Sequence, residues 1–283
     1  SVALNTPTVG KSTTLFERMP GQQTGIDLVH EFPKNVPFEL LQDQGSGAGV
    51  CIGDYDGDGE ADIFLTNYDR GNRLYRNLGR WRFEDVTSQA GVRGEGRWCS
   101  GAAFVDIDNN GDLDLSVGVF NAPNLLYVNQ GDGTFKEQAR SFGLDFRGAS
   151  VMMAFADYDR DGRLDAYLLT HRLNAGTDHR LPRNSKEAFT RAVVQATGGR
   201  QATVNPAYRE LFEIMDKGQG RMELMIAGQQ DYLYHNDGGG KFRIVNAEAG
   251  IRGNDIGLAA TRWDFNDDGW PDLYVSNDYK GPD

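Results

Sequence analysis

The chain is poor in cysteine and proline and has no long apolar run. Two cysteines in 283 residues, Cys51 and Cys99, do not make a disulfide framework. The lack of any run of about 18 apolar residues excludes an ordinary transmembrane helix. Residues 1–10 lack the basic and apolar stretches of a signal peptide, as would a mature chain that has lost its signal. Nine prolines against 36 glycines are typical of an all-β protein with many tight turns.

Positive charge is also scarce. The 29 Lys and Arg residues face 41 Asp and Glu residues, which gives a net charge of −12. An acidic surface repels phosphate backbones, so we expect no nucleic-acid partner. The hydrophobic fraction of 39% is enough for a packed core.

The two cysteines leave two interpretations open. Each precedes an Asp-rich segment, so the two can lie on neighbouring inner strands and form a disulfide. A disulfide has demanding geometry, and two buried free thiols are the simpler expectation.

One Asp-rich segment, with the pattern D-x-[DN]-x-[DN]-G-x-x-D, occurs four times. The copies are residues 54–62, 106–114, 157–165 and 264–272. Their first residues stand 52, 51 and 107 positions apart. A second motif, Leu-Tyr-x-Asn, follows three of the copies and ends at Asn77, Asn129 and Asn236. The spacing of the two motifs places the excess of the third interval in one insertion, between about residues 173 and 228.

Each repeat has the pattern of one propeller blade. A short apolar run precedes each Asp-rich segment and a β-branched or aromatic run follows it, so the segment connects two strands. The Leu-Tyr-x-Asn run and the stretch after a Gly-rich turn supply two more strands. Four strands in about 50 residues predict an all-β fold of β-propeller blades, each with four antiparallel strands. We expect a partial ring, about three and a half blades of seven, with a helical insertion.

The chain divides into four parts on this interpretation. Residues 1–45 form an N-terminal lead with an outer propeller strand near Phe16, and residues 46–172 hold blades 1 and 2 and the start of blade 3. Residues 173–228 are the helical insertion, and residues 229–283 end blade 3 and begin blade 4. The blade count implies either a fragment of a longer protein, whose chain holds the remaining blades, or one part of a ring that another segment completes.

The insertion contains two helical patterns. Asn184 or Ser185 can cap a helix that runs to about Thr197. Asn205-Pro206 is a cap followed by proline, which predicts a second helix that ends near Gly218.

The residue types in the Asp-rich segments predict calcium binding. Ca²⁺ takes six to eight oxygen ligands, and positions 1, 3 and 5 of a tight loop bring three short side chains to one centre. Glycine at position 6 permits the sharp turn. Position 7 then offers a backbone carbonyl, and the Asp at position 9 closes the site. The EF-hand is excluded, because position 12 is Leu65, Val117, Leu168 or Val275 in place of a bidentate Glu.

We expect about four Ca²⁺ ions, which would change the formal charge from −12 to −4. The strict octahedral geometry of Mg²⁺ fits such loops less well. The predicted side-chain ligands are Asp54, Asp56, Asp58, Asp62, Asp106, Asp108, Asn110, Asp114, Asp157, Asp159, Asp161, Asp165, Asp264, Asn266, Asp268 and Asp272. The predicted carbonyl ligands are Glu60, Asp112, Arg163 and Trp270.

These motifs resemble known calcium-binding repeats. The loops are similar to those of FG-GAP/VCBS repeats, which form the blades of integrin α-type propellers. The loop together with Asn72-Arg-Leu-Tyr-Arg-Asn77 and the Gly131-Asp-Gly-Thr-Phe135 turn resembles the ASPIC/UnbV, cartilage-acidic-protein-like type. The resemblance implies an extracellular, periplasmic or cell-surface setting, and a role in adhesion, ligand binding or scaffolding.

The leading functional hypothesis is therefore a binding module for a protein or glycan, without catalysis. The alternative is an extracytoplasmic enzyme acting on polysaccharide, with its site at the insertion or on missing blades. His171 and His179, eight residues apart in a loop, are the candidate acid/base groups. A third hypothesis is a subunit of a surface assembly. Residues 171–229 carry nine basic and six acidic residues, so the insertion can dock a partner or lie as a lid on its own blade.

Overall fold

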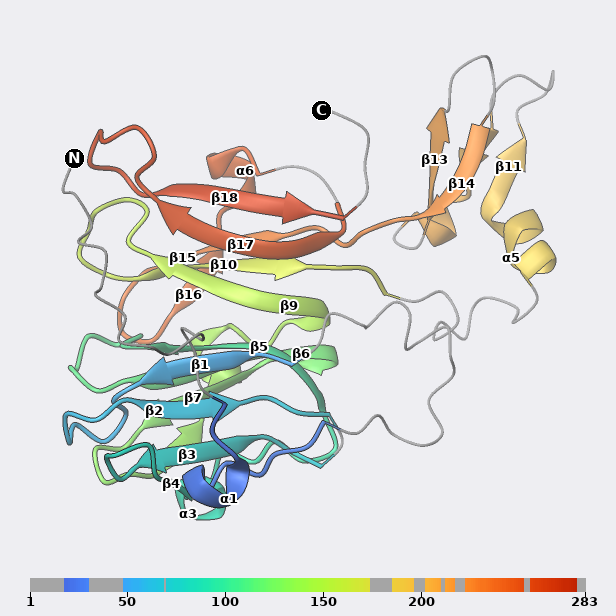
Figure 1. The fold of residues 1–283 in the computed structure, drawn as a ribbon. Helices are drawn as coiled ribbons and strands as arrows, with labels where there is room; N and C mark the ends of the chain where they lie inside the picture. The colour runs from blue at the N-terminus through green and yellow to red at the C-terminus, as the bar shows by residue number, and fades with distance from the viewer. Residues whose placement is uncertain are drawn as a thin grey trace, which may run out of the picture.

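The computed structural model describes residues 18–30, 48–68, 70–173, 185–195, 202–209, 212–216, 222–251 and 255–278. The fold is mostly antiparallel β-sheet, arranged as a stack of propeller blades with few helices (Figure 1). The partial β-propeller predicted from the repeats is confirmed.

Three blades have four strands each, and a fourth is represented by two strands. Blade 1 contains β1 (Val50–Gly53), β2 (Asp62–Leu65), β3 (Arg73–Asn77) and β4 (Phe83–Asp85). Blade 2 contains β5 (Trp98–Val105), β6 (Asp114–Pro123), β7 (Leu125–Asn129) and β8 (Phe135–Glu137). Blade 3 contains β9 (Arg147–Ala156), β10 (Asp165–Thr170), β15 (Tyr232–Asn236) and β16 (Phe242–Ile244). The last hairpin is β17 (Gly257–Trp263) and β18 (Asp272–Asn277).

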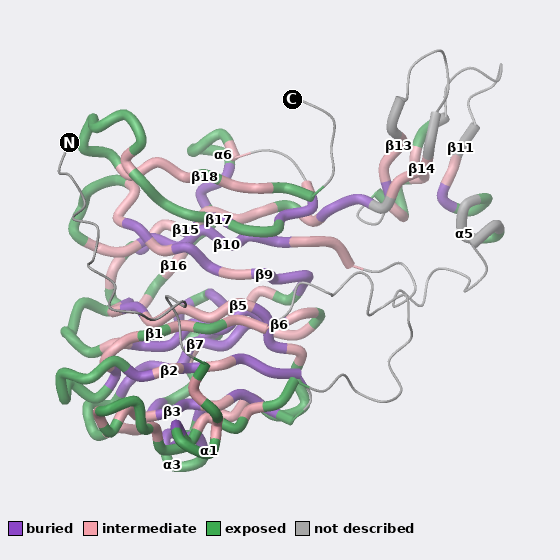
Figure 2. The backbone as a smooth tube through the Cα atoms, in the orientation of Figure 1, coloured by how far each residue is buried: buried purple, intermediate pink, exposed green. Residues whose placement is uncertain are grey.

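The core lies between the blades. One apolar cluster joins side chains of blade 1, such as Phe64 and Leu74, to Leu115 and Val117 of blade 2. A second cluster joins blades 2 and 3, and a third joins blade 3 to the β17–β18 hairpin. Figure 2 shows the buried backbone concentrated in the middle strands of the stack. Burial on both sheet faces explains the near-continuous apolar runs of these strands.

Small residues in the inner strands let neighbouring blades approach closely. A Cβ atom added to Gly49 would lie 2.6 Å from the carbonyl oxygen of Ser100 in blade 2. A Cβ atom added to Gly101 would lie 2.6 Å from the carbonyl oxygen of Val151 in blade 3. Contacts this short are sterically forbidden, so glycine sets the distance between blades here.

A four-residue helix follows the fourth strand of each blade and ends at a left-handed glycine. These helices are α3 (Thr87–Ala90), α4 (Ala139–Phe142) and α6 (Asn246–Ala249). The same unit precedes blade 1 as α1 (Gly21–Thr24), which ends at Gly25 with φ 84°. The N-terminal lead thus ends like the last part of a blade. Phe16, where the outer strand is expected, lies outside the described residues.

One pairing between blades was not expected. The long strand β6 extends past its own blade and pairs antiparallel with β9 through Phe120 and Ala149. Blades 2 and 3 therefore form one continuous sheet of β-strands.

The insertion differs from the two helices predicted for it. The first pattern forms α5 (Ser185–Ala192), and the chain then turns into β11 (Val193–Gln195), which pairs with β12 (Ala202–Val204). The second predicted helix is wrong. Asn205 does cap a turn, the 3₁₀ helix η2 (Pro206–Tyr208).

The chain after that turn forms the hairpin of β13 (Phe212–Asp216) and β14 (Met222–Ile226). Cross-strand pairing of the alternating Phe212 and Ile214 overrides the weaker helical signal. Ala192 and Phe212 are buried with Leu224 in a small separate core of this lobe.

Both cysteines are free thiols, as the simpler interpretation predicted. Cys99 is buried in the core between blades 1 and 2, and Cys51 packs against the same cluster. Burial raises the pKa of the Cys99 thiol to about 11 and that of Cys51 to about 12. Among the described residues, no helix is long and apolar enough to cross a membrane.

Candidate metal centre

The four Asp-rich segments lie along one edge of the blade stack. Each connects the first two strands of a blade, and in Figure 1 these connections all lie at the left side of the molecule. Direct contacts join neighbouring loops. The side-chain amide of Asn109 donates to the carbonyl of Gly162 at 2.8 Å, and the Arg160 guanidinium lies 5.1 Å from the Trp270 ring centroid.

Backbone amides hold the first carboxylate of each loop. In the first loop, Asp54 accepts from the N–H of Asp58 at 3.1 Å and from the N–H of Gly59 at 2.9 Å. The same pair of hydrogen bonds occurs in the other three loops, on Asp106, Asp157 and Asp264. Gly59 has φ 90°, which requires glycine at position 6.

The carboxylates at positions 1 and 3 gather with a third acid in three of the loops. Their oxygens lie within 4.8 Å of one another in each of three groups. The groups are Asp54, Asp56 and Asp58; Asp106, Asp108 and Asp114; and Asp157, Asp159 and Asp165. Ligands of one Ca²⁺ at 2.3–2.6 Å are at most about 5 Å apart, so each group has the spacing of a single coordination shell.

Amide side chains replace two of the acids. In the second loop, Asn110 accepts from the N–H of Asp112 at 2.7 Å, as Asp58 does from Glu60 in the first loop. In the fourth loop, the Asn266 side chain donates to Asp268 at 2.9 Å.

The position-9 Asp has a second role as an anchor inside the blade. Asp114 is completely buried and accepts from the N–H of Ile107 at 3.0 Å and from the N–H of Asn129 at 2.8 Å. Asp62 and Asp165 make the same two kinds of bond. Burial raises the pKa of Asp62 and of Asp114 to about 6. A buried carboxylate of this kind is stabilised by a neighbouring cation.

The residues at position 7 donate their N–H groups to the position-5 side chain in every loop. Glu60, Asp112, Arg163 and Trp270 all do so, at 2.7–2.9 Å. Coordination by their carbonyls stays a prediction.

Sequence comparison places the first three loops in a known repeat. The family described as FG-GAP-like repeat matches residues 54–117 and 117–168. Residues 54–168 are FG-GAP-like repeats. Their match begins at the first Asp-rich loop and includes the second and third loops of the described site.

Cartilage acidic protein 1 is similar to part of the chain. The Xenopus tropicalis protein is 29% identical over 138 residues, which is 47% of this chain and 21% of the relative. The Homo sapiens protein is 30% identical over 125 residues, 43% of this chain and 19% of the relative. The match thus spans about a fifth of the length of these relatives.

A solved structure of an Agrocybe aegerita lectin that recognises non-reducing terminal N-acetylglucosamine is 19% identical. It aligns with 81% of this chain and 60% of its own, at a TM-score of 0.31. A score this low carries no argument about fold or ligand.

The Asn that ends the Leu-Tyr-x-Asn motif of blade 2 connects that blade to blade 1 by a hydrogen bond. The Asn129 side chain donates to the carbonyl of Tyr55 in the preceding blade at 2.8 Å and to that of Leu113 at 3.1 Å. In the sequence, this Asn only marked the spacing of the repeats, and its hydrogen bonds were not predicted. Its presence at the same place in each repeat was the available signal of a structural role.

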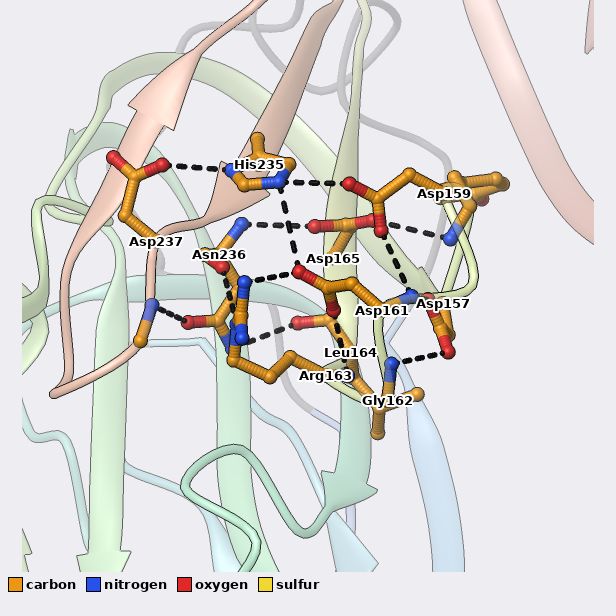
Figure 3. Close-up of polar contacts among 12 residues, drawn as sticks. Asp157, Asp159, Asp161, Gly162, Arg163, Leu164, Asp165, His235, Asn236 and Asp237 are labelled. Carbon is orange, nitrogen blue, oxygen red and sulfur yellow. Dashed lines mark hydrogen bonds and ion pairs between the residues drawn. The ribbon is translucent and has the colours of Figure 1, made fainter.

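His235 is the contact that the sequence analysis missed. It occupies the variable position of Leu-Tyr-x-Asn in blade 3, and its Nε2 lies 2.9 Å from Asp159 Oδ2 in the third loop (Figure 3). Its Nδ1 lies 2.8 Å from Asp237 Oδ1. Partial burial acts to lower the pKa of His235, but the hydrogen bonds to Asp237 and Asp159 outweigh it and raise the pKa.

The candidate acid/base groups His171 and His179 are not brought together within the described residues. His171 follows β10, and its backbone N–H donates to the carbonyl of Ala149 at 2.8 Å. His179 lies outside the described residues.

Proposed function

We propose that this chain is a calcium-stabilised propeller module that binds a protein or glycan ligand outside the cytoplasm, whether secreted, periplasmic or at the cell surface. It acts by binding and not by catalysis. The FG-GAP-like repeats and the similarity to cartilage acidic protein 1 support a binding module. The geometry of the loops supports calcium as the ion, and a cavity beside them is the basis for the proposed ligand site.

The repeated loop geometry is the observation that carries the calcium assignment. In each of the four loops, two backbone amides fix the first carboxylate and a third fixes the side chain at position 5. Carboxylates held this close repel one another without a cation. A hard dication with oxygen ligands removes that repulsion, and Ca²⁺ tolerates the mixed carboxylate and amide sets of the second and fourth loops.

A cavity of about 480 Å³ beside the loops is the proposed ligand site. It lies between blades 2 and 3 and is lined by Asn109, Gln138 and Lys241, with Phe142 as an aromatic wall. The glycines at 238–240 form part of its rim and leave the backbone open to a ligand. Hydrogen-bonding groups around an aromatic ring suit a sugar or a polar peptide loop.

Thermal unfolding with and without calcium tests the ion. We expect the Tm to fall when EDTA removes calcium and to return on recalcification, because an ion that binds only the folded state stabilises it by mass action. The double variant Asp54→Ala/Asp56→Ala should lose part of that response. Asp132→Asn is the matched control, since Asp132 lies in the β7–β8 turn outside the loops. A Tm that is the same in EDTA and in calcium contradicts the proposal.

Ligand binding is tested on glycan and peptide arrays with calcium present. Lys241→Ala should weaken binding to any ligand found, because Lys241 lines the cavity. Lys136→Ala on β8 is the charge-matched control. Equal binding by both variants would place the ligand elsewhere, and turnover of a bound polysaccharide would replace the binding role by an enzymatic one.

A further inference from the structure

The third Asp-rich loop differs from the others by having an imidazole beside its acids. His235 comes from β15, 70 residues after the end of the loop, and its Nε2 lies 2.9 Å from Asp159 Oδ2 and 3.9 Å from Asp161 Oδ2. The equivalent residues are Arg76 in blade 1 and Val128 in blade 2, neither of which is a metal ligand. The third loop therefore offers a nitrogen donor that the repeat itself does not require.

The other side of the imidazole is fixed by a carboxylate. His235 Nδ1 lies 2.8 Å from Asp237 Oδ1 (Figure 3). The Arg243 side chain in turn donates to Asp237 at 3.0 Å. A carboxylate on one ring nitrogen orients a metal-binding histidine and makes the other nitrogen a better donor. Asp237 directly follows β15 and is two residues from His235, so the arrangement is local.

We propose that the third loop binds a divalent transition-metal ion of the zinc class through His235 Nε2, Asp159 and Asp161. The inference rests on the proposed metal binding by the loops and narrows the ion for one of them. Ca²⁺ takes oxygen ligands, whereas Zn²⁺ takes histidine nitrogen together with carboxylate oxygen.

The geometry and charge of the site suit a small dication. Ligands of a tetrahedral Zn²⁺ stand about 3.4 Å apart, and the two distances from Nε2, 2.9 and 3.9 Å, lie on either side of that value. Arg163 pairs with Asp161, but Asp157, Asp159 and Asp165 leave the loop with a net negative charge. The His235 side chain is 20% exposed and that of Asp159 is 46% exposed, so an ion can enter from solvent.

Equilibrium dialysis against Zn²⁺, in buffer that also contains Ca²⁺, tests the proposal with elemental analysis of both metals. The native chain should hold one Zn²⁺, and its calcium content should fall by one, because Asp159 and Asp161 serve either ion. His235→Val, which introduces the residue of blade 2, should weaken Zn²⁺ binding at least 100-fold and keep calcium in the other loops. Asp237→Asn should weaken it about 10–100-fold. His30→Gln, which removes an imidazole elsewhere, should change neither metal.

Each remaining outcome decides the question. If His235→Val binds Zn²⁺ within threefold of the native chain, or the native chain binds none because a proton fills the place of the metal, the inference is wrong. If calcium binds the first two loops in those same samples, the proposed function stands although the zinc inference has failed. If zinc binds through His235 but no loop takes calcium, the inference stands and the calcium proposal falls. Co²⁺ in place of Zn²⁺ gives a second readout, a visible absorbance that His235→Val should abolish.

Discussion

Replacement of Asp114 by alanine separates the structural role of a position-9 Asp from its role as a ligand. The Asp114 carboxylate is fully buried and accepts from two N–H groups, on Ile107 and Asn129, that are themselves buried. Alanine leaves both donors without a partner, and each costs about 1–3 kcal/mol. Removal of the buried charge offsets part of that loss. We expect the free energy of unfolding in EDTA to fall by about 2–4 kcal/mol.

Asp272→Ala is the matched control. Asp272 occupies the same position of the fourth loop and accepts from the N–H of Phe265, an exposed residue whose amide can bond to water instead. The free energy of unfolding of Asp272→Ala in EDTA should fall by less than about 1 kcal/mol.

Urea unfolding, followed by tryptophan fluorescence, measures both variants with and without calcium. At a calcium concentration of 100 times Kd, loss of one bound ion adds about 2.7 kcal/mol to the cost of either variant. In EDTA, the free energy of unfolding should fall more for Asp114→Ala than for Asp272→Ala. In calcium, both variants should show a similar additional decrease. Equal losses of the two variants in EDTA would refute the anchoring role of Asp114.

Three further predictions concern the contacts between blades. Asn129→Ala should lower the free energy of unfolding by about 1–3 kcal/mol, because the carbonyl of Tyr55 loses its donor. Urea titration measures this, and an unchanged unfolding midpoint would contradict a stabilising role for the bond between the blades. The Cys99 thiol should resist alkylation at pH 8 in the folded chain and react fully in urea, because burial raises its pKa to about 11; rapid labelling of the native chain would contradict that burial. Gly101→Ala should cost more than about 1 kcal/mol, because its Cβ would lie 2.6 Å from the Val151 carbonyl; a Tm equal to that of the native chain would show that the blades can move apart.

The repeat arithmetic predicted most of the fold, because each level of the pattern agreed with the next. The Asp-rich loops, the apolar runs beside them and the Gly-rich turns all specify the same hairpins, and the structure has the expected strand order within each blade. The pairing of β6 with β9 escaped prediction, since it depends on how far one strand extends beyond its repeat.

The insertion was harder to predict, because it has no second copy in the chain. A capping pattern at Asn205-Pro206 did start one turn, but it carried no information about the strand pairing that follows. Local propensity is a weak guide where tertiary pairing decides the outcome.

The candidate site shows the same limit. The acids of the loops were readable from spacing, because each group comes from one short segment: positions 1, 3 and 5 in the first loop, and positions 1, 3 and 9 in the second and third. The contact of His235 with Asp159 joins segments on two different strands, and no local pattern connects them. A residue type that departs from the repeat, His where blades 1 and 2 have Arg76 and Val128, was the signal available.

Anomalous X-ray scattering from crystals grown in millimolar calcium tests the central claim most directly. The account predicts a peak inside the first loop, within coordination distance of Asp54, Asp56 and Asp58, and an equivalent peak in the second loop. Data from a crystal soaked in chelator should lose both peaks. Loops that show no anomalous peak at millimolar calcium, while the chain remains folded and equally stable in EDTA, would contradict the claim that these repeats are calcium sites.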